Sequence, residues 1–187
     1  MPAQTPHGFF AASPRPMSRP WGIISLMIGI LADSHDNITN LRAAVRLFRD
    51  AGCELVVHAG DFVAPFTARE LAALGCPVKS VFGNCDGEKA GLAAALEPFG
   101  LIHQAPLVFE HGGRRILVTH LNRPAEEFAA KHVYDVVIFG HTHKPDVRRD
   151  GKTLLINPGE TGGWVTGRST VAFYDPATSE ANLVTVA

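Results

Sequence analysis

Short apolar runs of four or five residues recur along the chain, and amphipathic stretches separate many of them. Apolar runs rich in β-branched residues predict buried strands, whereas apolar residues at positions i, i+4 and i+7 predict helices. Leu41, Val45 and Phe48 have the helical spacing, with Asn37 or Asn40 as the cap and Gly52 as the end. Strands are predicted at residues 28–32, 55–58, 78–82, 107–110, 115–119, 136–139, 153–156, 170–174 and 182–186, and further helices at 67–74, 88–96 and 124–131.

The order of these elements predicts an α/β protein. Strand and helix alternate through the first half of the chain, which is typical of strands joined by helical crossovers. The strands at 107–110 and 115–119 flank His111-Gly112-Gly113, a sequence that predicts a hairpin. The last two strands are expected to close the chain as an antiparallel pair.

Composition narrows the possible environments and partners. A chain of 187 residues suits one domain with a sizeable core, and 46% hydrophobic residues with a mean hydropathy of +0.09 are ordinary for a soluble globular protein. A net charge of −1 gives no basic footprint for nucleic acid. Three cysteines without a disulfide spacing fit a reducing cytoplasm.

Residues 1–26 are predicted to form a flexible, proline-rich extension, and residues 27–187 the domain itself. The longest apolar stretch, residues 21–32, is too short to span a bilayer, which needs about 20 residues. Met27 fits a native start. We therefore expect a cytoplasmic protein that has no membrane partner.

The most informative segment is Gly140-His141-Thr142-His143, which follows the apolar run at 136–139. Alternate residues of an extended chain point to one side, so His141 and His143 are predicted to share a face. Two imidazoles in that arrangement suggest a metal site, although a His-x-His in a loop is more often hydrogen-bonded and solvated. Polar residues at the ends of four earlier strands strengthen the metal interpretation.

Five predicted strands in all end in side chains that could coordinate a metal. Because ligands in α/β folds bind at the carboxyl ends of strands, we expect these groups to converge on one crevice. They are too many for one tetrahedral ion and about right for two. The predicted ligands are Asp33, His35, Asp61, Asn84, His120, His141 and His143.

Mixed imidazole and carboxylate ligands suit zinc, manganese, iron or nickel, and the sequence does not choose among them. If Asp61 bridges two ions, each receives four protein groups and keeps positions open for water and substrate. Two divalent ions against two carboxylates select an anion, for which a phosphate ester is the natural choice. A water bridging such ions is deprotonated near neutral pH, and the ions clamp the phosphoryl oxygens during in-line attack.

The ordered motifs Asp33-x-His35, Gly60-Asp61, Gly83-Asn84-x-Asp86, His120 and Gly140-His141-x-His143 resemble those of calcineurin-like metallophosphoesterases. The Gly83-Asn84-Cys85-Asp86 variant and the small size are similar to the compact microbial phosphodiesterase branch. The resemblance implies a two-sheet β-sandwich flanked by helices. It also implies one metal on Asp33, His35, Asp61 and His143 and a second on Asp61, Asn84, His120 and His141, with Asn84 also touching the substrate phosphate.

The chain departs from this family at Cys85, where many relatives have a histidine that is thought to protonate the leaving group. The resulting hypothesis is a phosphodiesterase that relies on its metals and on easy leaving groups, with Asp86 orienting the site. The alternative is that Cys85 is a small buried hydrophobic residue.

Several polar residues near the motifs have two interpretations. Asp36 and Asn37 could contact substrate, but a turn and helix cap is the preferred interpretation. His58 lies either behind the ligands or in the core. Glu160 stands where relatives often have serine, so a contact between it and phosphate is doubtful.

The sequence thus predicts a dinuclear metal-dependent phosphoesterase, with Asp61, Asn84, His120, Cys85 and Asp86 as its catalytic residues. A small phosphoester is the expected substrate, a diester rather than a monoester, and homo-oligomerisation is possible. The alternative is a catalytically silent scaffold, since a retromer subunit resembles this family in fold with little or no hydrolase activity. A phosphate or nucleotide sensor is a third option.

Overall fold

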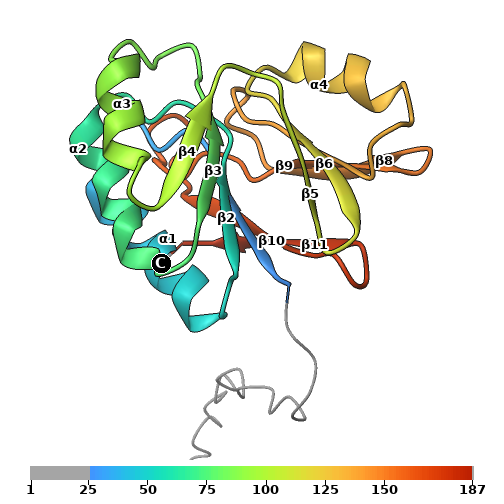
Figure 1. Cartoon of the computed structure of the whole chain (residues 1–187), viewed down its shortest axis with the longest axis horizontal. Coiled ribbons are helices and arrows are strands. Elements are labelled where there is room, and N and C mark those ends of the chain that lie inside the picture. Colours follow the sequence, from blue (N-terminus) through green and yellow to red (C-terminus); the bar gives the residue numbers. More distant parts are fainter. Residues whose placement is uncertain (1–25, 187) are drawn as a thin grey trace, which may run out of the picture.

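A computed structural model describes residues 26–186, and the predicted N-terminal extension lies almost wholly outside them. Two β-sheets pack face to face, and helices cover their outer sides (Figure 1). This arrangement confirms the predicted α/β class and the two-sheet sandwich flanked by helices.

The first sheet has six strands in the order β11-β10-β1-β2-β3-β4. Its parallel half leads from β1 to β4, and the antiparallel pair β10 and β11 completes the other edge. The strands are β1 (Ile28–Leu31), β2 (Leu55–His58), β3 (Val78–Val81), β4 (Gly100–His103), β10 (Thr170–Asp175) and β11 (Glu180–Thr185).

The second sheet has five strands in the order β5-β6-β7-β9-β8. Its three central strands are parallel, while β5 and β8 are antiparallel edges, and β5 and β6 form the predicted hairpin. The strands are β5 (Leu107–His111), β6 (Arg114–Val118), β7 (Val136–Ile138), β8 (Asp146–Asp150) and β9 (Thr153–Asn157).

Three helical segments cover the first sheet and one covers the second (Figure 1). Asn37 caps α1 by accepting the N–H of Asn40, as one of the two predicted caps. Gly29 of β1 lies directly under Phe48, so that a Cβ there would be 2.6 Å from the ring. The helices are α1 (Ile38–Asp50), α2 (Pro65–Ala68) with the 3₁₀ segment η1 (Arg69–Leu74), α3 (Lys89–Leu96) and α4 (Asn122–Ala129).

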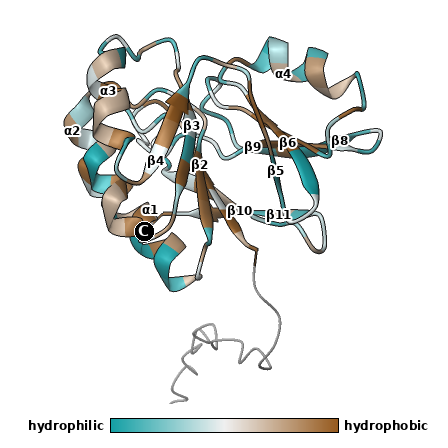
Figure 2. Cartoon of the chain, in the orientation of Figure 1, coloured by the Kyte–Doolittle hydropathy of each residue, from teal (hydrophilic) through white to brown (hydrophobic). Residues whose placement is uncertain are grey.

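The hydrophobic residues form layers that follow the side-chain alternation of the strands. Ile28 and Ile30 of β1 point between the sheets, where they meet Ile116 and Ile138. Leu31 points outward and packs with residues of α1. Figure 2 shows hydrophobic residues gathered in the central strands and hydrophilic ones on the outer surfaces of the helices and in the loops. With both faces covered, the strand ends are the place where the sheets leave polar groups accessible.

Two strands and some helix boundaries were not predicted. Strand β4 is a half-exposed edge strand, and β8 is an edge strand with the charged sequence Asp-Val-Arg-Arg-Asp, so neither has the apolar pattern of a buried strand. Helix α2 begins at Pro65 and continues as η1, whereas a single helix was expected from Thr67. Helix α4 begins at Asn122 rather than at Pro124.

None of the helices within residues 26–186 combines the length and the apolar character that a bilayer crossing requires.

Candidate metal centre

The loops that follow β1 and β2 run side by side and carry three of the predicted ligands. The N–H of Asp33 donates to the carbonyl of Gly60 at 3.0 Å, and the N–H of His35 donates to the carbonyl of Asp61 at 3.1 Å. The parallel pairing of the two strands thus extends into their loops. It holds the side chains of Asp33, His35 and Asp61 at one edge of the sheet.

The second sheet delivers its ligands to the same edge. The N–H of His141 donates to the Asp33 carboxylate at 3.0 Å, which ties the loop after β7 to the loop after β1. Gly140 makes this approach possible, since a Cβ there would be 2.8 Å from Asp33 Oδ2. The centre therefore lies where the two sheets meet.

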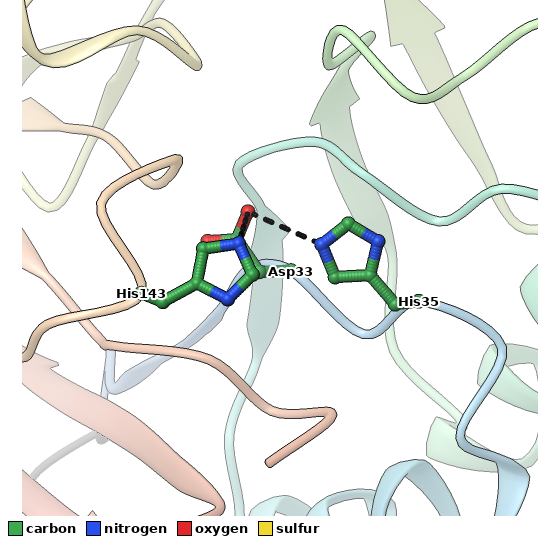
Figure 3. A group of neighbouring side chains, drawn as sticks. All are labelled: Asp33, His35 and His143. Carbon is green, nitrogen blue, oxygen red and sulfur yellow. Dashed lines mark ion pairs between the residues drawn. The ribbon is translucent and has the colours of Figure 1, made fainter. Parts of the chain in front are cut away.

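The seven predicted ligands form an unbroken series of side-chain contacts. Asp33 Oδ1 lies 3.7 Å from His143 Nε2 and 3.9 Å from His35 Nε2 (Figure 3). His35 Nε2 lies 3.6 Å from Asp61 Oδ2, which in turn lies 3.4 Å from His120 Nε2. Asn84 Oδ1 completes the series, 2.9 Å from His120 Nε2 and 2.8 Å from His141 Nδ1. Asp61 is the central member of this series.

The prediction that His141 and His143 share a face of an extended chain is wrong. Both residues have left-handed backbones, with φ of 68° and 60°. As a result, the His141 ring points to Asn84 and the His143 ring to Asp33, at opposite ends of the series. The spacing brings both imidazoles to the centre, but through a tight loop rather than a strand.

Backbone strain is concentrated at the centre. Left-handed φ values are uncommon for residues other than glycine and cost free energy, and such strain gathers at functional sites. Five of the seven predicted ligands have such values, namely Asp33, His35, Asp61, His141 and His143. The fold therefore tolerates strained backbones at these residues, and the strained backbones direct the side chains toward the centre.

Two imidazoles are fixed in one tautomer by acceptors behind them. His120 Nδ1 donates to the carbonyl of Ala59 at 2.8 Å, and His143 Nδ1 donates to the Glu160 carboxylate at 3.0 Å. Each Nε2 is then left facing the carboxylates of the centre. Metal-binding histidines have this same arrangement, in which the far nitrogen donates to a carbonyl or carboxylate.

The donors of this centre fit a bound cation. His35 Nε2 is buried and has no hydrogen-bond partner, although it faces both Asp33 and Asp61. Within residues 26–186, no lysine or arginine pairs with either carboxylate. Buried carboxylates are normally paired or metal-bound. Three overlapping groups have ligand atoms close enough together to share an ion: Asp33, His35 and His143; His35, Asp61 and Cys85; and Asp33, Asp61 and His120.

The two buried carboxylates differ in acidity. Burial raises the pKa of Asp33 to about 7, although His120 and His143 act in the opposite direction. Burial also disfavours the charge of Asp61, but its contact with His120 and the N–H of Cys85 outweigh burial and lower its pKa. Desolvation lowers the pKa of His35, which keeps its lone pair available. Asp61 is therefore ionised near neutral pH and Asp33 only partly so, and added positive charge would favour ionisation of both.

Cys85 and Asp86 occupy different environments. Cys85 is exposed, so the interpretation of it as a buried hydrophobic residue is wrong. Partial desolvation of its sulfur and the neighbouring charge of Asp61 nevertheless raise the pKa of its thiol to about 11. Asp86 is buried, and its carboxylate accepts the N–H groups of Asp61, Val63 and Gly83 at 3.0, 2.8 and 2.7 Å. Asp86 therefore joins the loops after β2 and β3.

The remaining polar residues of the motifs serve the local structure. Asn37 caps α1, and the Asp36 carboxylate accepts the N–H of Ala64 and the hydroxyl of Thr67, as the turn and cap interpretation predicts. His58 is fully buried, and burial lowers its pKa to about 3, so it is neutral. The N–H of Gly60 donates to its Nδ1 at 3.2 Å, and its Nε2 lies 3.0 Å from the hydroxyl of Ser34.

The supporting roles of two residues at and just after the end of β9 were not predicted from the sequence. Glu160 is completely buried, and its carboxylate accepts the N–H of Val165 and the N–H and hydroxyl of Thr166 besides His143 Nδ1. These donors lower its pKa to about 2 against the effect of burial. Asn157 Nδ2 donates to the carbonyl of Gly140 at 2.9 Å. The signal that located the ligands, a polar residue after a parallel strand, also applies to both of these residues.

The fold and the centre together define a class, because a helix-flanked double sheet with histidines and carboxylates at its strand ends is the metallophosphoesterase fold. Residues 26–179 match the Calcineurin-like phosphoesterase superfamily domain, and the chain belongs to this superfamily.

Relatives in sequence and structure agree with this assignment. The protein named phosphodiesterase MJ0936, from Methanocaldococcus jannaschii, is 35% identical over 162 residues, which cover 83% of this chain and 96% of the relative. A structure described as that of a novel archaeal phosphodiesterase has a TM-score of 0.81 and 33% identity, over 85% of this chain and 99% of that one. Vps29 from Chaetomium thermophilum shares the fold, with a TM-score of 0.63 and 16% identity over 86% and 92% of the two chains.

The position of Asp86 leads to a testable expectation for stability. Asp86→Ala leaves three backbone N–H groups without their acceptor, and we expect it to lower the free energy of unfolding by about 2–3 kcal/mol. Urea denaturation in the presence of a chelator measures this loss without a contribution from metal. The exposed neighbour Glu88 is the control, since Glu88→Ala is expected to change stability by less than about 0.5 kcal/mol. Equal stability of the two variants would contradict the role given to Asp86.

Proposed function

We propose that this protein is a metal-dependent phosphodiesterase with a dinuclear centre. The observation that carries the proposal is the unbroken series of seven side chains centred on Asp61. The phosphodiesterase matched in sequence and the archaeal phosphodiesterase matched in structure, at 35% and 33% identity over nearly their whole length, support the same activity.

The series divides naturally into two ligand sets that share Asp61. Asp33, His35 and His143 lie on one side of it, and Asn84, His120 and His141 on the other. Each set with Asp61 supplies four groups, as two divalent ions require, and the mixed donors suit manganese, nickel, zinc or iron. Ions bound there would activate water for attack on phosphorus and neutralise the phosphoryl oxygens.

The protein's own residues prepare this centre before substrate arrives. Ala59 and Glu160 hold the rings of His120 and His143, so that their Nε2 atoms face inward without further rearrangement. Asn84 directs its Oδ1 to two imidazoles, while its exposed Nδ2 has only Cys85 Sγ nearby, at 3.3 Å. That amide is therefore free to donate a hydrogen bond to a phosphoryl oxygen.

Cys85 gives the site its preference among leaving groups. A thiol holds its proton more tightly than an imidazolium does near neutral pH, so it is the weaker general acid. Substrates whose leaving group departs without protonation should therefore react best. Asp86 acts in this scheme by orienting the loop of Asp61. The proposed substrate is a small phosphoester, and the proposed location is the cytoplasm, where the protein acts alone or as a homo-oligomer.

The alternative is a silent scaffold or a phosphate-binding protein on the same fold. A scaffold has no need of a complete ligand set, whereas all seven positions are filled here and joined by contacts. The complete set favours catalysis over the scaffold, and turnover separates catalysis from phosphate binding.

The activity is tested with bis(p-nitrophenyl) phosphate and added manganese or nickel. We expect metal-dependent release of nitrophenol, faster from this diester than from p-nitrophenyl phosphate, and abolished by a chelator. If no metal among manganese, nickel, zinc and iron supports turnover, the scaffold or sensor alternative replaces the phosphodiesterase.

Metal content distinguishes the shared ligand from an unshared one. Asp61→Ala should remove both ions and lower activity by about 10³-fold or more, because both ligand sets lose a member. Asn84→Ala should weaken one ion and lower activity by about 10²-fold. Elemental analysis of the purified variants gives the metal count, and the circular dichroism spectrum controls for folding. An Asp61→Ala variant that keeps two ions would refute the bridging assignment.

The role of Cys85 is tested by two substitutions. We expect Cys85→His to accelerate hydrolysis of diesters with poor, alkyl leaving groups by about tenfold, because imidazolium supplies a proton. Cys85→Ala should leave hydrolysis of bis(p-nitrophenyl) phosphate within about twofold, since nitrophenolate leaves unaided. The ratio of rates on the two substrate classes is the readout. If neither variant changes this ratio, position 85 has no part in catalysis.

A further inference from the structure

A cavity of about 490 Å³ adjoins the candidate metal centre on the side of Asn84 and His120, both of which line it. Pockets for small organic ligands have this size. A phosphate ester bound at the centre would carry an organic group past these two residues. The cavity is therefore the space on the Asn84 and His120 side of the centre that the organic group of a bound phosphate ester can occupy.

The larger share of the cavity wall is apolar, and its apolar side chains come from both sheets. Phe82 follows β3 of the first sheet, while Leu121 and Phe128 belong to the start and the body of α4 beside the second sheet. Leu121 is 42% exposed, so its side chain is open to a ligand in the cavity. Two aromatic rings and an exposed leucine favour a flat, apolar occupant.

One cation stands at the cavity without a carboxylate partner among residues 26–186. Asp86 lines the cavity, but its carboxylate already accepts three backbone N–H groups. Lys89 is the one cation among the described lining residues, and its Nζ lies 5.4 Å from the centre of the Phe82 ring and 3.5 Å from Gln104 Oε1. Lys89 is exposed, so its ammonium is available to an acceptor on a ligand.

We propose that this cavity selects the organic group of the substrate, and that the preferred group is an aromatic ring with a negative charge or acceptor at its far end. This proposal rests on the proposed function, because the phosphorus-binding centre anchors the ligand. Phe82, Leu121 and Phe128 contact the ring, and Lys89 contacts the outer acceptor. Leu121 and Lys89 are thus specificity-determining residues, and neither belongs to the seven predicted ligands.

Three phosphonates that share one anchoring group test the two steps of recognition separately. Methylphosphonate has no ring, phenylphosphonate adds the ring, and 4-phosphonobenzoate adds a carboxylate at the far end. Titration calorimetry with the manganese-loaded protein measures their affinities without turnover. We expect the ring to tighten binding about tenfold through burial of apolar area. The carboxylate should add about threefold through an exposed ion pair.

The variants assign each step to a side chain. Lys89→Met should remove the gain from the carboxylate and keep the gain from the ring, whereas Lys89→Arg should keep both. Leu121→Ser should reduce the gain from the ring. Lys79→Met is the matched control for Lys89, since Lys79 lies 5.1 Å from the ring of Phe109 in a similar contact outside the cavity. Val108→Ser is the control for Leu121, with the same exposure of 42%.

The outcomes separate this proposal from the proposed function. Equal affinities of the three phosphonates for the unaltered protein, or equal effects of Lys79→Met and Lys89→Met, would overturn the cavity assignment even if bis(p-nitrophenyl) phosphate is hydrolysed. Graded affinities that depend on Lys89 and Leu121 would support it even in a protein that hydrolyses no diester, and in that case the hydrolase function alone would fail.

Discussion

The burial of two carboxylates at the junction of two sheets is the constraint on which the rest of this structure depends. Asp33 and Asp61 are almost completely buried, and within residues 26–186 the basic side chains that contact them are imidazoles rather than lysine or arginine. An unpaired buried charge is costly, so the surroundings must supply hydrogen bonds and counter-charge. The backbone N–H groups of His141 and Cys85 supply part of this stabilisation. Cations bound between the two carboxylates and the imidazoles would supply the rest.

The arrangement around these carboxylates explains why a second layer of polar residues is buried behind the centre. Each of these residues joins a loop that carries a predicted ligand to another part of the fold: Asp86, Glu160, Asn157 and His58. Their hydrogen bonds stabilise left-handed backbone conformations that are unfavourable in a loop without such support. A rigid site of this kind does not have to reorganise during reaction, which is the condition for effective electrostatic catalysis.

Much of the fold and most of the centre could be predicted from the sequence, because apolar runs mark the buried strands and polar residues mark the points where those strands end. The buried strands have continuous apolar patterns, and the polar residues after them stand out against those patterns. Edge strands β4 and β8 could not be found in this way, since one is short and half-exposed and the other is charged.

The directions of side chains were beyond sequence reasoning for a different reason. His141 and His143 diverge because their backbone dihedral angles are set by long-range contacts with Asp33 and Asn157, not by the spacing of the two residues. The exposure of Cys85 and the burial of Glu160 likewise depend on which loops meet in space. Local pattern predicts which residues arrive at the edge, while tertiary contacts decide what each one touches there.

The division of the ligands between the two sheets has a consequence for the order of events during biosynthesis. Asp33, His35, Asp61 and Asn84 leave the ribosome well before His120, His141 and His143, so a nascent chain has only an incomplete set. In the proposed function, a complete set of ligands forms only when the second half docks on the first, and cations bound there would add their binding free energy to that docked state. Metal loading would thus follow the assembly of the sandwich and stabilise it.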